Sequence, residues 1–109
     1  MATKQLIDNF LNTAVDTVQV AYSAPPDKVV VIEAFTVANN SSVNASYKAY
    51  IKSSSGLLSP ILPFKIVVWG ETDLGISIVS QAIPAGGSLQ VESSALSSLY
   101  FTVTGRELS

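Results

Sequence analysis

Apolar and polar residues alternate through the stretch SVNASYKAYIKSSS, residues 42–55. A period of two predicts a strand with one buried and one solvated side. The first side carries Val43, Ala45, Tyr47, Ala49 and Ile51, and the second carries Asn44, Ser46, Lys48, Tyr50 and Lys52. The second side could be a site, a surface that meets another molecule, or a solvated coating. Outward lysines discourage edge pairing. We interpret the second side of this strand as a polar sheet face.

The rest of the chain from residue 13 onward also has a β pattern. Runs rich in β-branched residues are separated by turn signals such as APPD, NNSS and PAGGS. Besides the strand above, we expect strands within residues 16–24, 28–38, 61–70, 74–83, 89–93 and 99–108. Short strands at this spacing predict a single antiparallel β-sandwich, jelly-roll or Ig-like, over residues 13–109. YSAPPDKVVV and AIPAGGSLQV share a strand–Pro turn–strand pattern, which suits such an arrangement.

Residues 1–12 have a different spacing. Leu6, Ile7, Phe10 and Leu11 follow one another at i, i+1, i+4 and i+5, which predicts one stripe of a short helix. A helix this short needs a surface to lie on. We therefore expect an N-terminal helical arm, which either plugs its own domain or docks on a neighbouring subunit.

Two predicted strands, 28–38 and 61–70, carry apolar residues on both sides. Phe35 shares a side with Glu33, and Val67 shares a side with Trp69. A strand of a simple sandwich is buried on one face only, so the second face is covered by the chain's own arm and loops or by another subunit. Glu33 on such a face needs a partner, either Arg106 or a lysine of a neighbour.

The composition favours association. The chain has 109 residues, enough for one domain, with 48% hydrophobic and only 13% charged residues, about half of the usual charged fraction. A chain with few charged side chains has fewer polar groups with which to cover its surface. Part of its apolar surface is therefore expected to be buried against another molecule, which indicates an oligomer or a subunit of a larger assembly. The net charge of −2 and the scattered basic residues argue against a nucleic-acid partner.

Groups suited to catalysis are scarce. The chain has no His and no Cys, which removes the commonest general base, metal ligands and thiol nucleophile. Glu71 and Asp73 in GETDLG are expected to be solvated charges of a hairpin loop. The N-x-S matches at Asn39, Asn40 and Asn44 reflect composition. We predict no enzymatic activity, no catalytic, cofactor or metal site, and no small-molecule substrate.

Targeting signals are not evident in the sequence. Residues 1–11 lack a long apolar segment, and the apolar run VVVIEAFTVA is interrupted by Glu33 and is too short to span a bilayer. We expect no membrane partner and a protein that is made and kept in a cytosol, at least until it is assembled.

An alternative function is glycan binding. Tyr47 and Tyr50 flank Lys48, and Trp69 is the only tryptophan. Aromatic rings beside hydroxyls and amides can stack on sugars, so the alternative is a glycan-binding β-sandwich module on a phage or bacterial surface. The alternation places Tyr47 inward and Tyr50 outward, which weakens this interpretation.

Two segments resemble a known family. YSAPPDKVVVIEAFTVANNSS and IPAGGSLQVESSALSSLYFTVTGRELS are similar to the corners and strand ends of small β-sandwich structural proteins from tailed bacteriophages. The resemblance covers roughly residues 13–109. It implies a non-enzymatic virion subunit, such as a capsid decoration protein or a head–tail neck or collar protein.

That resemblance also implies partners and a location. The partners would be further copies of the chain and other phage structural proteins, and the protein would be in the virion after synthesis in the bacterial host cytoplasm. The interface candidates come from the arm, the doubly apolar strands and the last strand: Leu6, Ile7, Phe10, Leu11, Glu33, Phe35, Val67, Trp69 and Arg106.

Overall fold

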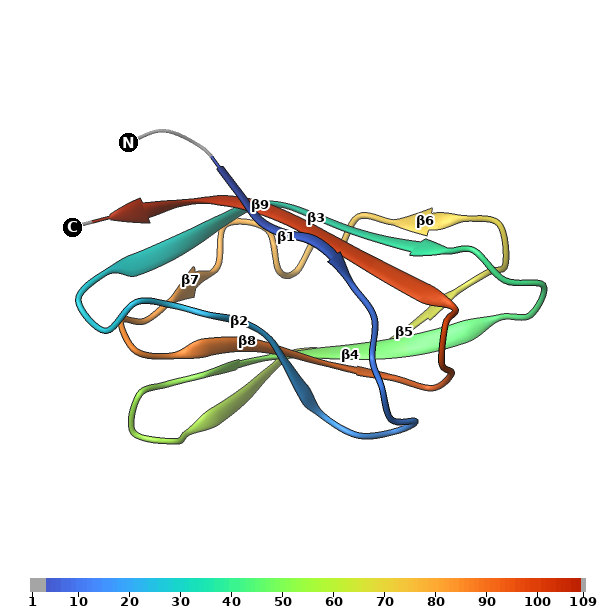
Figure 1. Ribbon diagram of the computed structural model, residues 1–109, viewed down its shortest axis with the longest axis horizontal. Coiled ribbons are helices and arrows are strands. Elements are labelled where there is room, and N and C mark those ends of the chain that lie inside the picture. The colour runs from blue at the N-terminus through green and yellow to red at the C-terminus, as the bar shows by residue number, and fades with distance from the viewer. Residues whose placement is uncertain (1–3, 109) are drawn as a thin grey trace.

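A computed structural model describes residues 4–108, without the side chain of Asp8. Within this range the structure contains nine β-strands and no helix, and the strands form two antiparallel sheets (Figure 1). The strands are β1 (Lys4–Phe10), β2 (Gln19–Ser23), β3 (Val29–Asn39), β4 (Ala45–Lys52), β5 (Leu58–Val67), β6 (Thr72–Asp73), β7 (Ala82–Ile83), β8 (Ser88–Ser93) and β9 (Leu99–Leu108).

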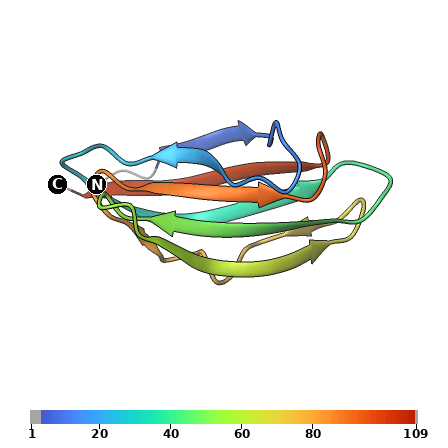
Figure 2. The same cartoon turned by 90° about the horizontal axis from the view of Figure 1, so that it is seen from below.

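The two sheets lie one above the other in Figure 1, and the view from below in Figure 2 looks onto β2, β8, β4 and β5 with the other sheet behind them. The first sheet has the order β1-β9-β3, and the short strands β6 and β7 pair with opposite halves of β3. The second sheet has the order β2-β8-β4-β5. Most consecutive strands lie in opposite sheets, while β4 and β5 form a hairpin within one. The predicted all-β, two-sheet sandwich is therefore confirmed.

The core lies between the sheets and contains one aromatic cluster. Phe35, Tyr47 and Phe101 come from β3, β4 and β9, and each is at most 1% exposed. Their ring centroids are 5.6 to 6.1 Å apart, a spacing at which aromatic pairs attract each other beyond area burial alone. Aliphatic residues such as Ile32, Leu89 and Val91 fill the remaining space.

The predicted N-terminal helix is wrong. Lys4–Phe10 forms β1, which pairs with β9; residues 1–3 of the predicted arm lie outside the described residues. The register of β1 shifts twice, so Ile7 lies opposite Val103 and Phe10 opposite Phe101. Each shift adds a residue to β1, and two residues three apart therefore face the core. This spacing imitates a helical stripe.

A bulge also explains the two apolar sides of β3. The pairing with β9 shifts between Ile32 and Ala34, and Glu33 is the extra residue. Before the bulge Ile32 faces the core, and after it Phe35 and Val37 do. The inward side therefore changes parity within one strand. β3 has one buried face, and its sequence pattern does not by itself require a second cover.

The segment 74–83 is mainly a loop, so the strand predicted there is wrong apart from β7. Hydrogen bonds from the Ile78 and Gln81 amides to Gly75 and Ile78 carbonyls turn the backbone. Ile78 is fully buried and Ile76 is 85% exposed. The spacing of the apolar residues is typical of a strand, but Ile78 is buried in the core while Ile76 points to solvent.

The two similar proline turns lie side by side. The Gly86 amide donates to the Pro25 carbonyl at 3.0 Å, and the Ala24 amide donates to the Gly87 carbonyl at 2.9 Å. The turns lead out of β2 and into β8, and those strands pair. The two segments with the shared strand–Pro turn–strand pattern thus form two adjacent corners of the sandwich.

Candidate functional site

The outer face of the second sheet is polar, as the alternation in β4 predicts. Tyr47 is buried, while Tyr50 lies on the outer side. The register sets Lys48 opposite Glu92, Tyr50 opposite Gln90 and Lys52 opposite Ser88. β4 and β8 together therefore form a continuous polar surface.

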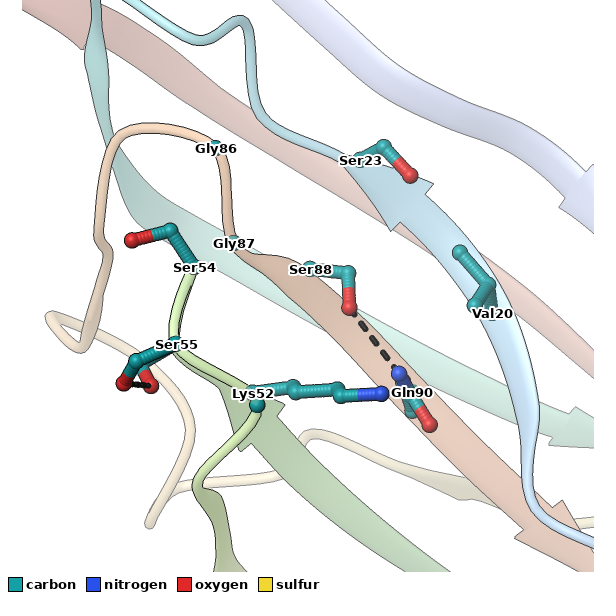
Figure 3. Close-up of a pocket in the computed structure, with 11 residues that line it drawn as sticks. Val20, Ser23, Lys52, Ser54, Ser55, Gly86, Gly87, Ser88 and Gln90 are labelled. Atoms are coloured by element: carbon teal, nitrogen blue, oxygen red, sulfur yellow. Dashed lines mark hydrogen bonds between the residues drawn. The ribbon is translucent and has the colours of Figure 1, made fainter.

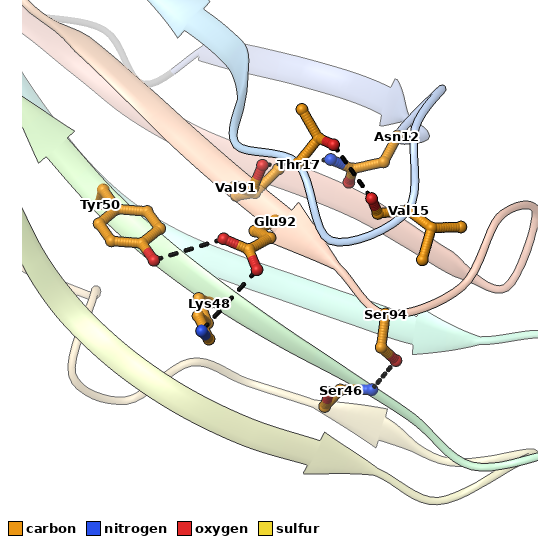
Figure 4. A network of polar contacts seen from close by, with 9 residues as sticks. All are labelled: Asn12, Val15, Thr17, Ser46, Lys48, Tyr50, Val91, Glu92 and Ser94. Carbon is orange, nitrogen blue, oxygen red and sulfur yellow. Dashed lines mark hydrogen bonds and ion pairs between the residues drawn. The ribbon is translucent and has the colours of Figure 1, made fainter.

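One half of this face is internally paired (Figure 4). The Lys48 ammonium lies 3.8 Å from one Glu92 oxygen, and the Tyr50 hydroxyl donates to the other at 3.5 Å. The Ser46 amide donates to the Ser94 hydroxyl at 2.8 Å. The Glu92 charge is thus balanced locally, and this half resembles a solvated coating.

The other half is hollowed. A depression of about 390 Å³ lies over the ends of β2, β4 and β8 (Figure 3). Lys52, Ser88 and Gln90 line it, together with the turns at Ser53–Gly56 and Gly86–Gly87. We call it the serine hollow.

An apolar surface lies at the far end of the same sheet. Phe64, Ile66, Val68 and Trp69 are 58%, 54%, 40% and 59% exposed; we call these four residues the β5 apolar patch. Phe64 and Ile66 line one shallow pocket with Asn44, whose side-chain oxygen accepts a hydrogen bond from the Trp69 amide at 3.1 Å. Asn44 therefore adjoins both the pocket at Phe64 and Ile66 and the backbone at Trp69.

The backbone edge beside this patch is protected. β5 is the last strand of its sheet, and it contains Pro60, Pro63 and Lys65. Proline cannot donate to a strand ladder, and an edge lysine opposes pairing with another sheet. Addition of a further strand at this edge is therefore disfavoured.

A polar contact joins the two sheets behind β5. The Tyr47 hydroxyl donates to Asp73 Oδ2 at 2.6 Å, and the Lys65 ammonium lies 3.8 Å from Asp73 Oδ1. Burial, with the hydrogen bond to Asp73 and its charge, raises the pKa of Tyr47 well above its ordinary value of 10.0. Asp73 lies in β6 and also accepts the Gly75 amide at 3.1 Å. It is not the solvated hairpin charge expected from the sequence.

Glu33 and Arg106 contact each other on the outer side of the first sheet. Arg106 Nε is 2.8 Å from Glu33 Oε2, although the N–H is not aligned for a hydrogen bond. The predicted partner of Glu33 within the chain is thus present. Both side chains are about a third or more exposed, so solvent screens the pair and its contribution to stability is small.

The predicted interface residues are distributed between core and surface. Ile7, Phe35 and Val67 are buried within the chain's own core, and Leu6, Phe10 and Leu11 are partly buried. Trp69 is the candidate with the greatest exposure. The buried candidates have little accessible side-chain surface. Their contact with a partner stays a prediction.

Sequence reasoning missed Phe64 and Ile66 as surface residues. Their signal was present, because in PFKIVVWG they alternate with Val67, which faces the core. Lys52 and Gln90 were also missed as a pair, since only the register of β4 with β8 brings them to one hollow.

Among the described side chains, no group of three or more His, Cys, Asp or Glu residues could hold a metal ion. Residues 4–108 contain no helix that could cross a membrane. No protein-family model matches the sequence, and neither curated proteins nor solved structures yield a significant match.

Proposed function

We propose that this protein is a non-enzymatic structural subunit of a bacteriophage virion, a capsid decoration or a head–tail neck or collar protein. It associates with further copies of itself through the β5 apolar patch. The observation that carries the proposal is the exposure of Phe64, Ile66 and Trp69, each more than half accessible on a chain with 13% charged residues.

The strand order supports the architectural part of the proposal. The sheets have the orders β1-β9-β3-β6 and β2-β8-β4-β5, with most connections crossing between them, and this order favours a jelly roll over an Ig-like sandwich. Viral capsid domains and lectins use jelly rolls. Fold alone does not establish function, so this order is supporting evidence beside the surface.

The patch is suited to burial against a second copy. Removing a large apolar side chain from water contributes about 1.5–3 kcal/mol when it is fully buried. Phe64 and Ile66 project from one strand and line the same pocket, and Trp69, two residues after that strand ends, is 59% exposed. The prolines and the lysine of β5 oppose edge-to-edge pairing of copies into an extended sheet. This favours a closed assembly.

The test is sedimentation of the purified chain over a range of concentrations. We expect concentration-dependent association that Phe64→Ser and Trp69→Ser each weaken about tenfold or more, since buried aromatic anchors dominate interfaces. Leu57→Ser is the matched control, because Leu57 is 70% exposed at the opposite end of β5. A chain that stays monomeric, or associates equally well in all three variants, contradicts assembly through this patch.

The virion part has a separate test. Density-gradient particles from the source culture should contain this chain when analysed by mass spectrometry. Its absence from purified particles, with the free protein present in the lysate, contradicts a virion role even where self-association is observed.

A further inference from the structure

The serine hollow carries a second inference, separate from assembly at the β5 apolar patch. It lies at the Lys52 end of β4, whereas the patch adjoins the Ser46 end. Gly87 forms part of its wall, and a Cβ there would collide with the Lys52 carbonyl oxygen. The turn at Gly86–Gly87 can therefore approach β4 closely only because a side chain is absent.

Lys52 gives the hollow a positive charge. All six Lys and Arg residues lie within residues 4–108, and five of them are within 4.0 Å of a carboxylate. Among the described side chains, Lys52 has no such neighbour. No carboxylate lines the hollow, and Glu92, the next outward residue of β8 after Gln90, is balanced by Lys48. An unbalanced ammonium in a neutral depression attracts an anion.

Neutral hydrogen-bonding groups surround that ammonium. Gln90 is only 8% exposed, and its Nε2 donates to the Ser88 hydroxyl at 3.0 Å. Its Oε1 accepts no hydrogen bond from a described residue. Figure 3 shows Ser23 and Ser54 on opposite sides of Ser88, with the Lys52 side chain reaching toward Gln90. Ser88, Gln90 and Ser23 come from two paired strands, and their hydroxyl and amide groups line the hollow beside Lys52, whereas the Ser54 hydroxyl points away from it. Such groups suit a ligand with several hydroxyls.

The size and the apolar part of the hollow narrow the ligand class. About 390 Å³ is at the small end for ligand pockets, sufficient for one or two sugar rings. Val20, half exposed on β2, offers an apolar contact for the C–H face of a ring. A single cation cannot track a nucleic-acid backbone, which requires several phosphate contacts.

We propose that the serine hollow binds an acidic saccharide, with Lys52 contacting its anionic group and Gln90, Ser88 and Ser23 contacting its hydroxyls. The anionic group is a carboxylate, as in a uronic acid, or a phosphate ester. Both share the chemistry of a charged oxygen on a hydroxyl-rich ring, and the ammonium can donate to either.

Calorimetric titration of the full chain with four probes tests this proposal: glucuronate, glucose 6-phosphate, glucose and inorganic phosphate. We expect at least one charged sugar to bind, and glucose and free phosphate to bind about tenfold or more weakly. Binding to glucuronate alone assigns a carboxylate ligand, and binding to glucose 6-phosphate alone assigns a phosphate ester. Added salt should weaken either.

Two variants locate the binding. Lys52→Gln should weaken the charged sugar about tenfold or more, whereas Lys48→Gln, on the same face but paired with Glu92, should change it less than about twofold. Ser23→Leu keeps the charge and narrows the hollow, and it should also abolish binding. Thermal unfolding confirms that each variant is folded.

Three results would overturn the proposal. The first is glucose that binds as tightly as the charged sugar that binds. The second is glucose 6-phosphate that binds, but no more tightly than free phosphate. The third is a loss of affinity that is the same in Lys52→Gln and Lys48→Gln. No binding of either charged sugar to the folded wild-type chain overturns it as well. None of these results bears on association through the β5 apolar patch.

Discussion

The Tyr47 hydroxyl donates a 2.6 Å hydrogen bond to the Asp73 carboxylate, and this bond links the two sheets of the sandwich. Tyr47 belongs to β4 of the second sheet and is 1% exposed, whereas Asp73 belongs to the short strand β6 of the first. The ring also packs against Phe35 and Phe101. One side chain thus joins the aromatic core to the polar margin beside the β5 apolar patch.

Tyr47→Phe should destabilise the fold by about 1–3 kcal/mol, because it removes a hydrogen bond to a charged group at a buried position. Tyr50→Phe is the matched control, since its hydroxyl makes a longer contact of 3.5 Å with Glu92 on the outer face; we expect a loss of about 0–1 kcal/mol. Urea unfolding of both variants measures the difference. Equal losses would contradict a special role for the link between sheets.

Alkaline pH should weaken the wild-type fold through Tyr47. Its pKa in the folded chain is raised above the ordinary value of 10.0, chiefly by burial. Below pH 10 the phenol is protonated in both states, so this stabilisation is fully present. Above it the unfolded chain releases the proton while the folded chain keeps it, and the free energy of unfolding falls with pH.

The size of this pH effect can be isolated with the same variant. One group contributes a decrease of at most about 1.4 kcal/mol per pH unit. Between about pH 9 and about pH 11, Tyr47→Phe should show a shallower decrease than wild type in urea midpoints. Parallel pH profiles would indicate that other groups, such as Lys4, carry the alkaline loss.

Gly75→Ala should be strongly destabilising. Gly75 has φ +53°, and a Cβ there would overlap the ring of Phe35. Gly70→Ala separates the two causes, because Gly70 has φ +75° with open space around it. Backbone strain alone predicts about 1–2 kcal/mol for Gly70→Ala, and the added overlap predicts about 1–3 kcal/mol more for Gly75→Ala. Equal losses in thermal unfolding would show that the Phe35 ring moves aside at little cost.

β1 should behave as part of the fold rather than as a free arm. Ile7 is 6% exposed opposite Val103, so Ile7→Ala should cost about 2–4 kcal/mol. Gln5→Ala, on an exposed position of the same strand, should change stability by less than about 0.5 kcal/mol. Urea unfolding reports both values. An unchanged midpoint for Ile7→Ala would restore the idea of an arm that docks elsewhere.

The sequence predicted best where alternation is regular. β4 runs without a bulge on its β8 side, so counting by two placed Tyr47 inward and Tyr50 outward correctly. The same counting failed at β1 and at Glu33, because an inserted residue reverses every side chain that follows it. The pattern of Leu6, Ile7 and Phe10 then resembled a helix although the backbone is extended.

The candidate sites followed the same division. The partner of Glu33 was foreseen because a carboxylate beside apolar neighbours requires compensation, and Arg106 supplies it. Lys52 and Gln90 lie 38 positions apart, and nothing local to either residue announces the hollow. Their association depends on strand register.

Two-residue periodicity is a local property of the chain, and it was enough to predict an antiparallel sandwich. Composition alone showed that the chain has few charges, no His and no Cys. Tertiary structure decided which apolar residues remain outside. Phe64 and Phe35 are chemically identical, yet one is 58% exposed and the other 1%. The difference arises because Phe64 lies on the outer side of its sheet, in one pocket with the outward residues Asn44 and Ser46, whereas the bulge at Glu33 turns Phe35 toward the facing sheet.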